Sequence, residues 1–230
     1  MTSASAAGES ASHVRQHRSL TAAAEKRALV WMAQRMPAWV NSDHLSALGV
    51  MSMAGVGAAF WLAGSHPGIG LPLVVLCLAL NWFGDSMDGT LARVRNRQRP
   101  RYGFYLDHVL DVAGTTMMLA GLAASGFMDP FIAVVTLVAW LLVTAESFLA
   151  TFARSVFRMS FGWFGPTELR ILIMAGALKL LRGATVEPFG FGPYRLFDIG
   201  GVCASAGLAV IFVVNAARNA AALYREETRW

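Results

Sequence analysis

Six apolar segments, each long enough to cross a bilayer as a helix, restrict the fold of this chain more than any other feature. A membrane-spanning helix needs roughly 17 to 25 mostly apolar residues, because the hydrocarbon core is about 30 Å thick. The segments are centred near Phe60, Leu78, Met117, Leu137, Ala175 and Leu208. With 56% hydrophobic and 14% charged residues, the chain is also too apolar for an ordinary soluble domain. The sequence therefore predicts an all-α integral membrane protein with six transmembrane helices.

The residues before the first apolar segment divide into two parts. Residues 1–19 are small and polar and lack the apolar core of a signal peptide, so we expect a disordered tail. Residues 20–37 combine charged side chains with Trp31, a composition typical of an amphipathic helix in the membrane interface, and Pro37 should end that helix. We expect residues 38–230 to form one six-helix membrane domain. Cys77 and Cys203, both in apolar segments, are interpreted as packing residues.

Lysine and arginine are distributed unevenly between the two predicted sides of the membrane. With six spans, the N-terminus, residues 93–102, residues 154–170 and the C-terminus share one side, and that side carries most of the basic residues. The positive-inside rule makes this side cytoplasmic. The arginines of residues 95–101 can also be explained without a role in function, as topology determinants that attract anionic lipid headgroups. Nothing in this charge pattern calls for nucleic acid as a partner.

Four aspartates lie at the cytoplasmic ends of the second and third apolar segments. Asp85 and Asp88 are three residues apart, and Asp107 and Asp111 are four apart, so each pair shares one face of its helix. Carboxylates near hydrocarbon are expensive to desolvate and are therefore usually paired, metal-bound or functional. Hard divalent cations prefer oxygen ligands. The sequence thus predicts an acidic cage for Mg²⁺ or Mn²⁺ on the cytoplasmic side.

The residues around these aspartates complete a longer pattern. In order, it comprises Asp85, Asp88, Gly89, Ala92, Arg93, Gly103, Asp107 and Asp111. At all eight positions, and at every spacing, it resembles the signature of the CDP-alcohol phosphotransferase family. The six-span layout and the amphipathic N-terminal helix are also similar to that family, so the resemblance covers most of the chain.

The resemblance implies an enzyme of phospholipid biosynthesis that moves a substituted phosphoryl group from a CDP-linked donor to an alcohol hydroxyl and releases CMP. It implies that the four aspartates hold two Mg²⁺ or Mn²⁺ ions, with Asp111 also acting as general base. Arg93 would clamp phosphate oxygens or orient the aspartates. Gly89, Ala92 and Gly103 would let the nucleotide approach the backbone, although small residues also allow close helix packing.

Several polar residues outside the pattern are further candidates for substrate binding. Ser46 lies in a segment that loosely resembles the family's turn before the first span, and it would touch the nucleotide. Glu146, inside the fourth apolar segment, would meet the acceptor alcohol or pair with Arg154. Glu168 and Arg170 would line the acceptor pocket or cap the start of the fifth span.

Two features of the sequence favour different substrates. His108, in LDHVLD, and the segment FGPTELR resemble choline and ethanolamine phosphotransferases, whose acceptor is diacylglycerol. His108 is alternatively a residue that orients an aspartate. The compact six-span layout instead resembles bacterial members that use CDP-diacylglycerol and a small alcohol, and we favour this donor. The resemblance further implies a homodimer in the bacterial cytoplasmic membrane, with the active site on the cytoplasmic side.

A divalent-cation transporter or metal-binding membrane protein is the main non-enzyme alternative. A transporter needs acidic groups near the membrane midplane and a route beyond them, whereas these aspartates lie on the cytoplasmic side. It would also leave Gly89, Ala92 and Arg93 without a role. The sequence therefore favours the enzyme.

Overall fold

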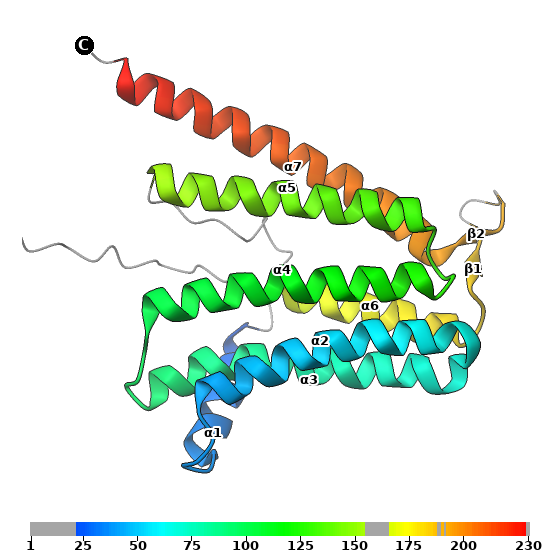
Figure 1. Cartoon of the computed structure of the whole chain (residues 1–230), viewed down its shortest axis with the longest axis horizontal. Coiled ribbons are helices and arrows are strands. Elements are labelled where there is room, and N and C mark those ends of the chain that lie inside the picture. The colour runs from blue at the N-terminus through cyan, green and yellow to red at the C-terminus, as the bar shows by residue number, and fades with distance from the viewer. Residues whose placement is uncertain (1–21, 155–165, 188–189, 191, 229–230) are drawn as a thin grey trace, which may run out of the picture.

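The computed structural model describes residues 22–154, 166–187, 190 and 192–228. The helices of this part of the chain are α1 (Ala22–Arg35), α2 (Ser42–Ser65), α3 (Pro67–Val94), α4 (Pro100–Ala124), α5 (Pro130–Arg154), α6 (Pro166–Leu180) and α7 (Leu196–Glu227). Helices α2 to α7 run alternately in opposite directions (Figure 1). As a result, α1, the α3–α4 turn and the C-terminal ends of α5 and α7 lie at one end of the molecule, which we call the α1 end.

Among the described residues, four helices are long and apolar enough to cross a membrane: α2, α3, α5 and α7. The prediction of a mainly helical integral membrane protein is thereby confirmed. Helix α4 has 25 residues but carries Asp107 and Asp111, and the described part of α6 has 15 residues. The crossing of the membrane by these two helices remains a prediction, which their alternating directions support.

A short hairpin interrupts the otherwise helical chain between α6 and α7. It consists of β1 (Thr185–Val186) and β2 (Tyr194–Arg195), which pair in antiparallel register. Strands of two residues leave no periodic pattern in a sequence, so this hairpin could not be predicted. The hairpin lies at the end of the molecule opposite the α1 end (Figure 1).

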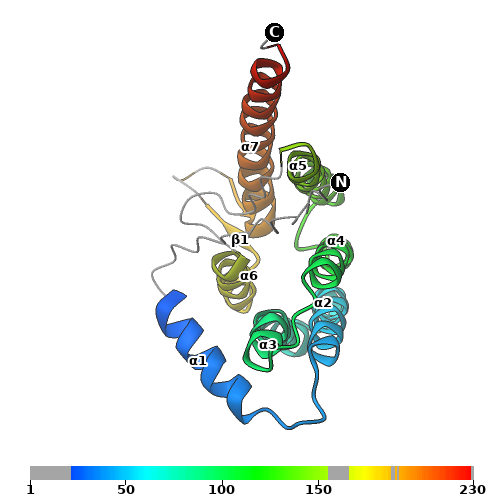
Figure 2. The same ribbon diagram turned by 90° about the vertical axis from the view of Figure 1, so that its left-hand side faces the viewer.

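Helix α1 lies obliquely beside the other helices (Figure 2) and is attached to α3. Its Glu25 accepts a hydrogen bond from Trp82 Nε1 at 2.8 Å. Arg95 Nη2 donates to two carbonyl groups that follow α1, each at 2.9 Å. Leu29 and Ala33 are buried in a cluster with apolar residues of α3. The structure has a helix at Ala22–Arg35, while the interfacial amphipathic helix over residues 20–37 remains a prediction. The predicted tail of residues 1–19 lies outside the described residues.

Glycines bring both α3 and α4 close to the backbone of α2. A methyl group added at Gly121 of α4 would lie 2.0 Å from the carbonyl oxygen of Gly57 in α2. One added at Gly84 of α3 would lie 2.6 Å from the carbonyl oxygen of Leu45 in α2. Small residues permit this close packing of helix backbones in a membrane. The α2 backbone thus fixes the separation of the two helices that carry the four aspartates.

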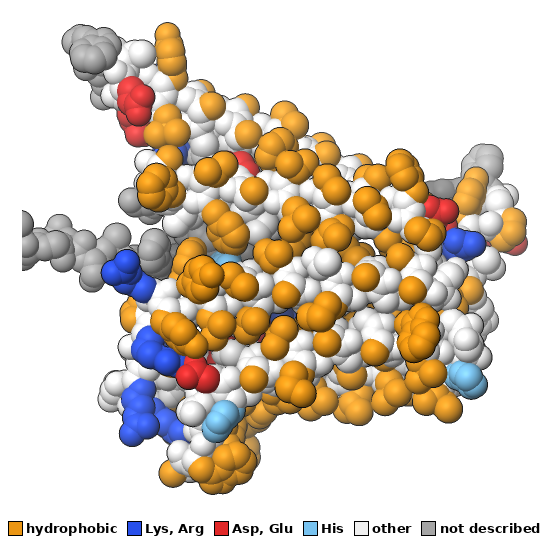
Figure 3. All heavy atoms as spheres, in the orientation of Figure 1, with side chains coloured by type: hydrophobic (Ala, Val, Ile, Leu, Met, Phe, Trp, Pro, Cys, Tyr) orange, Lys and Arg blue, Asp and Glu red, His pale blue; other side chains and the backbone are white. Residues whose placement is uncertain are grey.

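Helix α7 packs mainly against α5. At the end away from α1, the Asp129 backbone N–H donates to Asp198 Oδ1 at 2.6 Å, and the hydroxyls of Thr136 and Ser205 lie 3.0 Å apart. Only 11% of the apolar stretch of α7 is buried within the protein, so most of this helix faces outward. Hydrophobic side chains cover the visible face of α5 and α7 (Figure 3).

Candidate active site

The carboxylate of Asp88 is buried between α2 and α3, with hydrogen-bond donors at both oxygens. Ser46 Oγ of α2 donates to Asp88 Oδ2 at 2.7 Å, and the Gly89 backbone N–H donates to Asp88 Oδ1. Ser42 Oγ, in the first turn of α2, donates to the Asp88 carbonyl at 2.9 Å. These donors offset the desolvation of a buried charge. The structure therefore brings Ser46, a candidate from the sequence, directly to the acidic region.

Asp85, one turn before Asp88, is ion-paired with Arg170 of α6. Arg170 Nη2 lies 2.6 Å from Asp85 Oδ2. Arg170 Nε donates to Asn81 Oδ1 at 2.8 Å, and Asn81 Nδ2 donates to the Gly49 carbonyl of α2 at 3.0 Å. The sequence predicts Arg170 at the acceptor pocket or at the start of the fifth span, whereas the structure places it at Asp85. Asn81 was not singled out, although a polar residue one turn before Asp85 in an apolar segment is a signal that could have identified it.

The two remaining aspartates lie on α4, one turn apart. Asp107 and Asp85 both lie close enough to Asp88 to repel its negative charge. This places three of the four predicted ligands in one region, with contributions from α3 and α4. Asp107 is partly buried, whereas Asp111 is exposed, as a group that meets a substrate must be.

The donor set has the chemistry of a site for divalent cations, although its side chains are turned toward other partners. Carboxylate oxygens are the ligands that Mg²⁺ and Mn²⁺ prefer, and Asp85 holds a cation here, namely the guanidinium of Arg170. In the part of the chain that the structure describes, no three His, Cys, Asp or Glu side chains are placed to hold one ion together. Two divalent ions would therefore require these carboxylates, Asp85 above all, to leave their present partners.

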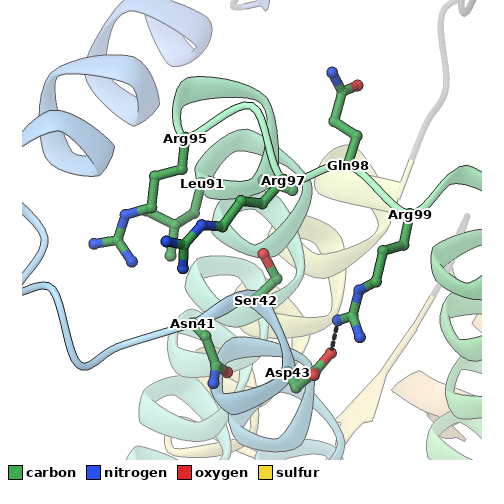
Figure 4. Close-up of a pocket in the computed structure, with 9 residues that line it drawn as sticks. Asn41, Ser42, Asp43, Leu91, Arg95, Arg97, Gln98 and Arg99 are labelled. Atoms are coloured by element: carbon green, nitrogen blue, oxygen red, sulfur yellow. Dashed lines mark hydrogen bonds and ion pairs between the residues drawn. The ribbon is translucent and has the colours of Figure 1, made fainter.

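A cavity of about 370 Å³ lies at the α1 end, next to the backbone of Asp88. Its lining comes from the start of α2, the end of α3 and the α3–α4 turn: Asn41, Ser42, Asp43, Leu91, Ala92, Arg95, Arg97, Gln98 and Arg99. Figure 4 shows Arg99 paired with Asp43 at one edge. A volume of this size is typical of small-molecule sites. Ala92 belongs to the eight-position pattern, so the pattern contributes to the lining of the cavity in addition to supplying the aspartates.

Arg93 and the two glycines of the pattern have distinct surroundings. Arg93 Nη2 donates to Thr90 Oγ1 at 3.0 Å, and a methyl group at Gly89 would lie 3.3 Å from Arg93 Nη1. The guanidinium thus rests over Gly89 while remaining exposed. A methyl group at Gly103 would meet no atom of the described residues within 4 Å. Close helix packing therefore gives no reason for glycine at position 103, and the space beside it is open to a ligand.

Glu146 lies at the contact between α5 and α7. Its Oε1 accepts a hydrogen bond from Asn219 Nδ2 at 2.6 Å, and Asn219 Oδ1 accepts one from Arg154 Nη1 at 2.6 Å. The structure thus joins Glu146 to Arg154 through a residue of α7. This supports the pairing alternative for Glu146, and its role at the acceptor remains a hypothesis.

Replacing Asn219 with leucine is expected to lower the melting temperature of the detergent-purified protein. The substitution leaves a buried carboxylate and a guanidinium without the amide between them, and an unsatisfied buried group costs about 1–3 kcal/mol. Asn215→Leu is the matched control, because Asn215 lies one turn earlier on α7 and its side chain makes no hydrogen bond within the described residues. Equal melting temperatures for the two variants would show that the link does not hold α7 in place.

The remaining candidate residues are His108 on α4 and Glu168 on α6. His108 Nδ1 is 2.5 Å from the Phe104 carbonyl oxygen. Its ring stacks on Phe104 with 4.3 Å between centroids and meets Phe148 of α5 edge-on at 5.3 Å. Glu168 lies in the first turn of α6, two residues before Arg170. His108 therefore lies at the α4–α5 contact, and Glu168 is on the helix that delivers Arg170 to the aspartates.

Comparison with known proteins identifies a family for most of the chain. The family model described as CDP-alcohol phosphatidyltransferase matches residues 45–216. This range runs from the first turn of α2 into α7 and includes every residue of the eight-position pattern. A search of curated proteins gave no significant match.

Proposed function

The chain belongs to the CDP-alcohol phosphatidyltransferase family, and on this premise we propose that it transfers a phosphatidyl group from CDP-diacylglycerol to a small alcohol. Family membership makes it an enzyme of phospholipid synthesis, a transferase of substituted phosphate groups acting on a CDP-alcohol, rather than a cation transporter. The observation that supports the proposal most strongly is the convergence of Asp85, Asp88 and Asp107, with Arg170 paired to Asp85.

The four aspartates are the proposed ligands of two divalent ions, Mg²⁺ or Mn²⁺. Bound there, the ions would neutralise the pyrophosphate of the donor and stabilise the departing CMP. Ser46 of α2 and the Gly89 N–H of α3 itself keep the Asp88 carboxylate oriented. Asp111, exposed on the same helix as Asp107, is free of the burial that would keep it from the substrate.

Donor binding falls to the arginines and small residues at the α1 end. Arg93 is exposed and rests over Gly89, where its planar guanidinium can reach phosphate oxygens. The cavity lined by Ala92 and the α3–α4 turn offers arginines to an anionic nucleotide, and the open space at Gly103 lies in the first turns of α4. Since most basic residues gather at this end (Figure 3), we infer that it faces the cytoplasm, where nucleotides are.

In the proposed reaction, the acceptor oxygen forms a bond to the phosphorus that carries diacylglycerol. The bond from this phosphorus to the bridging oxygen breaks, and CMP leaves with that oxygen. Asp111 takes the proton from the acceptor hydroxyl, which requires the two groups to approach within hydrogen-bond distance. Glu168 and Arg170, on α6, are the residues we propose for the acceptor side, because α6 brings Arg170 to Asp85.

A CDP-choline or CDP-ethanolamine phosphotransferase acting on diacylglycerol is the second candidate. The observation that favours it is His108, which directly follows Asp107 and packs between two phenylalanines at the α4–α5 contact. The chemistry at phosphorus is the same in both cases, and only the group carried by CDP and the acceptor differ. A homodimer in a bacterial cytoplasmic membrane completes the proposal.

Release of CMP by the purified protein in detergent tests the proposal. CDP-diacylglycerol is offered with a panel of small alcohols, in parallel with CDP-choline and CDP-ethanolamine plus diacylglycerol, each with Mg²⁺ and Mn²⁺. We expect CMP from CDP-diacylglycerol and one alcohol, and only in the presence of metal. CMP formed only from CDP-choline or CDP-ethanolamine would select the second candidate, and no CMP from any pair would count against both.

A further inference from the structure

We propose that Arg170 is a resident counter-cation that holds Asp85 until a divalent ion displaces it, and that Asn81 is the positioning residue that orients Arg170 for this exchange. The inference rests on the proposed function, because it takes the aspartates to bind divalent ions. It adds that a divalent ion must compete with the Arg170 guanidinium for the carboxylate of Asp85.

The first argument is the difference in exposure between the two charged partners. The Arg170 side chain is 14% exposed, whereas that of Asp85 is 39% exposed, and their contact at 2.6 Å is a charge-assisted hydrogen bond. An ion from solution can therefore approach Asp85 from its open side while Arg170 remains behind it. Binding of the ion and release of the guanidinium are then linked events at one carboxylate.

The second argument is that Asn81 holds Arg170 independently of Asp85. Asn81 is buried at 7% exposure, and its amide uses both ends: Nδ2 donates to the Gly49 carbonyl, and Oδ1 accepts from Arg170 Nε. The nitrogen that contacts Asp85 is a different one, Nη2. When Asp85 turns to a metal ion, the bond from Nε to Asn81 remains, so the guanidinium stays at the site with Nη2 available to an anionic substrate group.

The third argument is the contrast with Asp88. The donors that hold the Asp88 carboxylate are a neutral hydroxyl, Ser46 Oγ, and a neutral backbone N–H, that of Gly89. A neutral donor can remain bound beside a metal ion without charge repulsion, whereas a guanidinium at the same carboxylate repels the ion. An entering divalent ion therefore competes with the Asp85–Arg170 ion pair more directly than with the hydrogen bonds of Asp88.

Binding of Mn²⁺ to the detergent-purified protein, followed by the electron paramagnetic resonance signal of free Mn²⁺, tests the exchange without relying on turnover. Arg170→Gln removes the competing cation and is expected to tighten Mn²⁺ binding by about 5- to 100-fold. Arg101→Gln is the matched control, because it removes the same charge from the first turn of α4, where the side chain is exposed. Equal tightening in both variants would reveal a general charge effect and overturn the proposal.

Arg170→Lys provides a second test in case the Arg170→Gln variant does not fold. Lysine keeps the charge but lacks the Nε–H that Asn81 binds, so it is a less fixed competitor. We expect its Mn²⁺ affinity to lie between those of the wild type and Arg170→Gln. An affinity equal to that of the wild type would show that the charge alone matters and would remove the role of orientation.

Asn81→Leu tests the positioning residue. It is expected to tighten Mn²⁺ binding and, at saturating Mn²⁺, to lower kcat for CMP release by about tenfold or more, because Arg170 is no longer held at the site. Ser52→Ala is the control, since Ser52 is also buried in the bundle but bonds only the Leu48 carbonyl of its own helix. Equal Mn²⁺ affinities and equal kcat values for these two variants would refute the role of Asn81.

The outcomes separate this inference from the proposed function. Tighter Mn²⁺ binding by Arg170→Gln, with no CMP formed by the wild type from any substrate pair, would support the exchange and count against the proposed reaction. CMP release by the wild type, together with equal Mn²⁺ affinities of Arg170→Gln and Arg101→Gln, would support the reaction and refute the exchange. Absence of Mn²⁺ binding by the wild type would overturn the inference outright.

Discussion

Replacing Asp111 with asparagine is expected to lower CMP release by about 10²- to 10⁴-fold, the usual contribution of a general base. Asparagine has nearly the same shape but does not accept the proton of the acceptor hydroxyl. The three aspartates that lie together, Asp85, Asp88 and Asp107, are unchanged. Much of the Mn²⁺ binding should therefore survive, so that activity falls far more than metal affinity.

The control for this substitution is Glu187→Gln, which removes a carboxylate with the same chemical change. Glu187 is exposed beside the β1–β2 hairpin, at the end of the molecule away from the aspartates. CMP release by Glu187→Gln should equal that of the wild type. If Asp111→Asn also kept wild-type turnover at saturating metal, the general base would have to be another residue.

Replacing Gly121 with alanine is expected to destabilise the protein by about 1–3 kcal/mol or more, the usual range for overpacking. The added methyl group would lie 2.0 Å from the Gly57 carbonyl oxygen and 2.4 Å from its carbonyl carbon. These are backbone atoms, so no side-chain rotation relieves the clash, and α4 must move away from α2. The melting temperature of the detergent-purified protein measures this loss.

Separation of α2 from α4 should also reduce activity, because α2 supplies Ser46 to Asp88 while α4 carries Asp107 and Asp111. Gly207→Ala provides the comparison, since a methyl group at Gly207 of α7 meets no described atom within 4 Å. Alanine has the higher helix propensity, so this variant should melt at or slightly above the wild-type temperature. A common melting temperature for both variants would contradict the close α2–α4 contact.

The positions of the helices could be predicted from the sequence because strong local signals mark them. All six predicted centres lie inside α2 to α7, as Phe60 in α2 and Leu208 in α7 illustrate. Prolines stand at the first position of α3, α4, α5 and α6, where the missing N–H costs no hydrogen bond. Helix α1 ends at Arg35, two residues before Pro37. Helix periodicity likewise places each aspartate pair on one face without knowledge of the fold.

The partners across helices could not be predicted, because periodicity gives the face of a residue but not the helix opposite it. Arg170 was expected at a pocket, yet its contacts with Asn81 and Asp85 depend on α6 packing against α3. Likewise, Glu146 and Arg154 were considered as a direct pair from their spacing along one helix. The amide that joins them comes from Asn219, 73 positions from Glu146, and only the packing of α7 brings it there.

The length of α7 ties the protein to the thickness of the bilayer around it. Its 32 residues, at 1.5 Å per residue, extend about 48 Å, well beyond a hydrocarbon core of about 30 Å. Because α5 is its principal neighbour and most of its apolar surface faces outward, few contacts within the described residues oppose a change in the tilt of α7. A thinner bilayer or a short-chain detergent micelle would increase the tilt of α7 and pull on the amide link between Asn219 and Glu146. The lipid environment that this enzyme helps to produce would thus act mechanically on its own C-terminal helix.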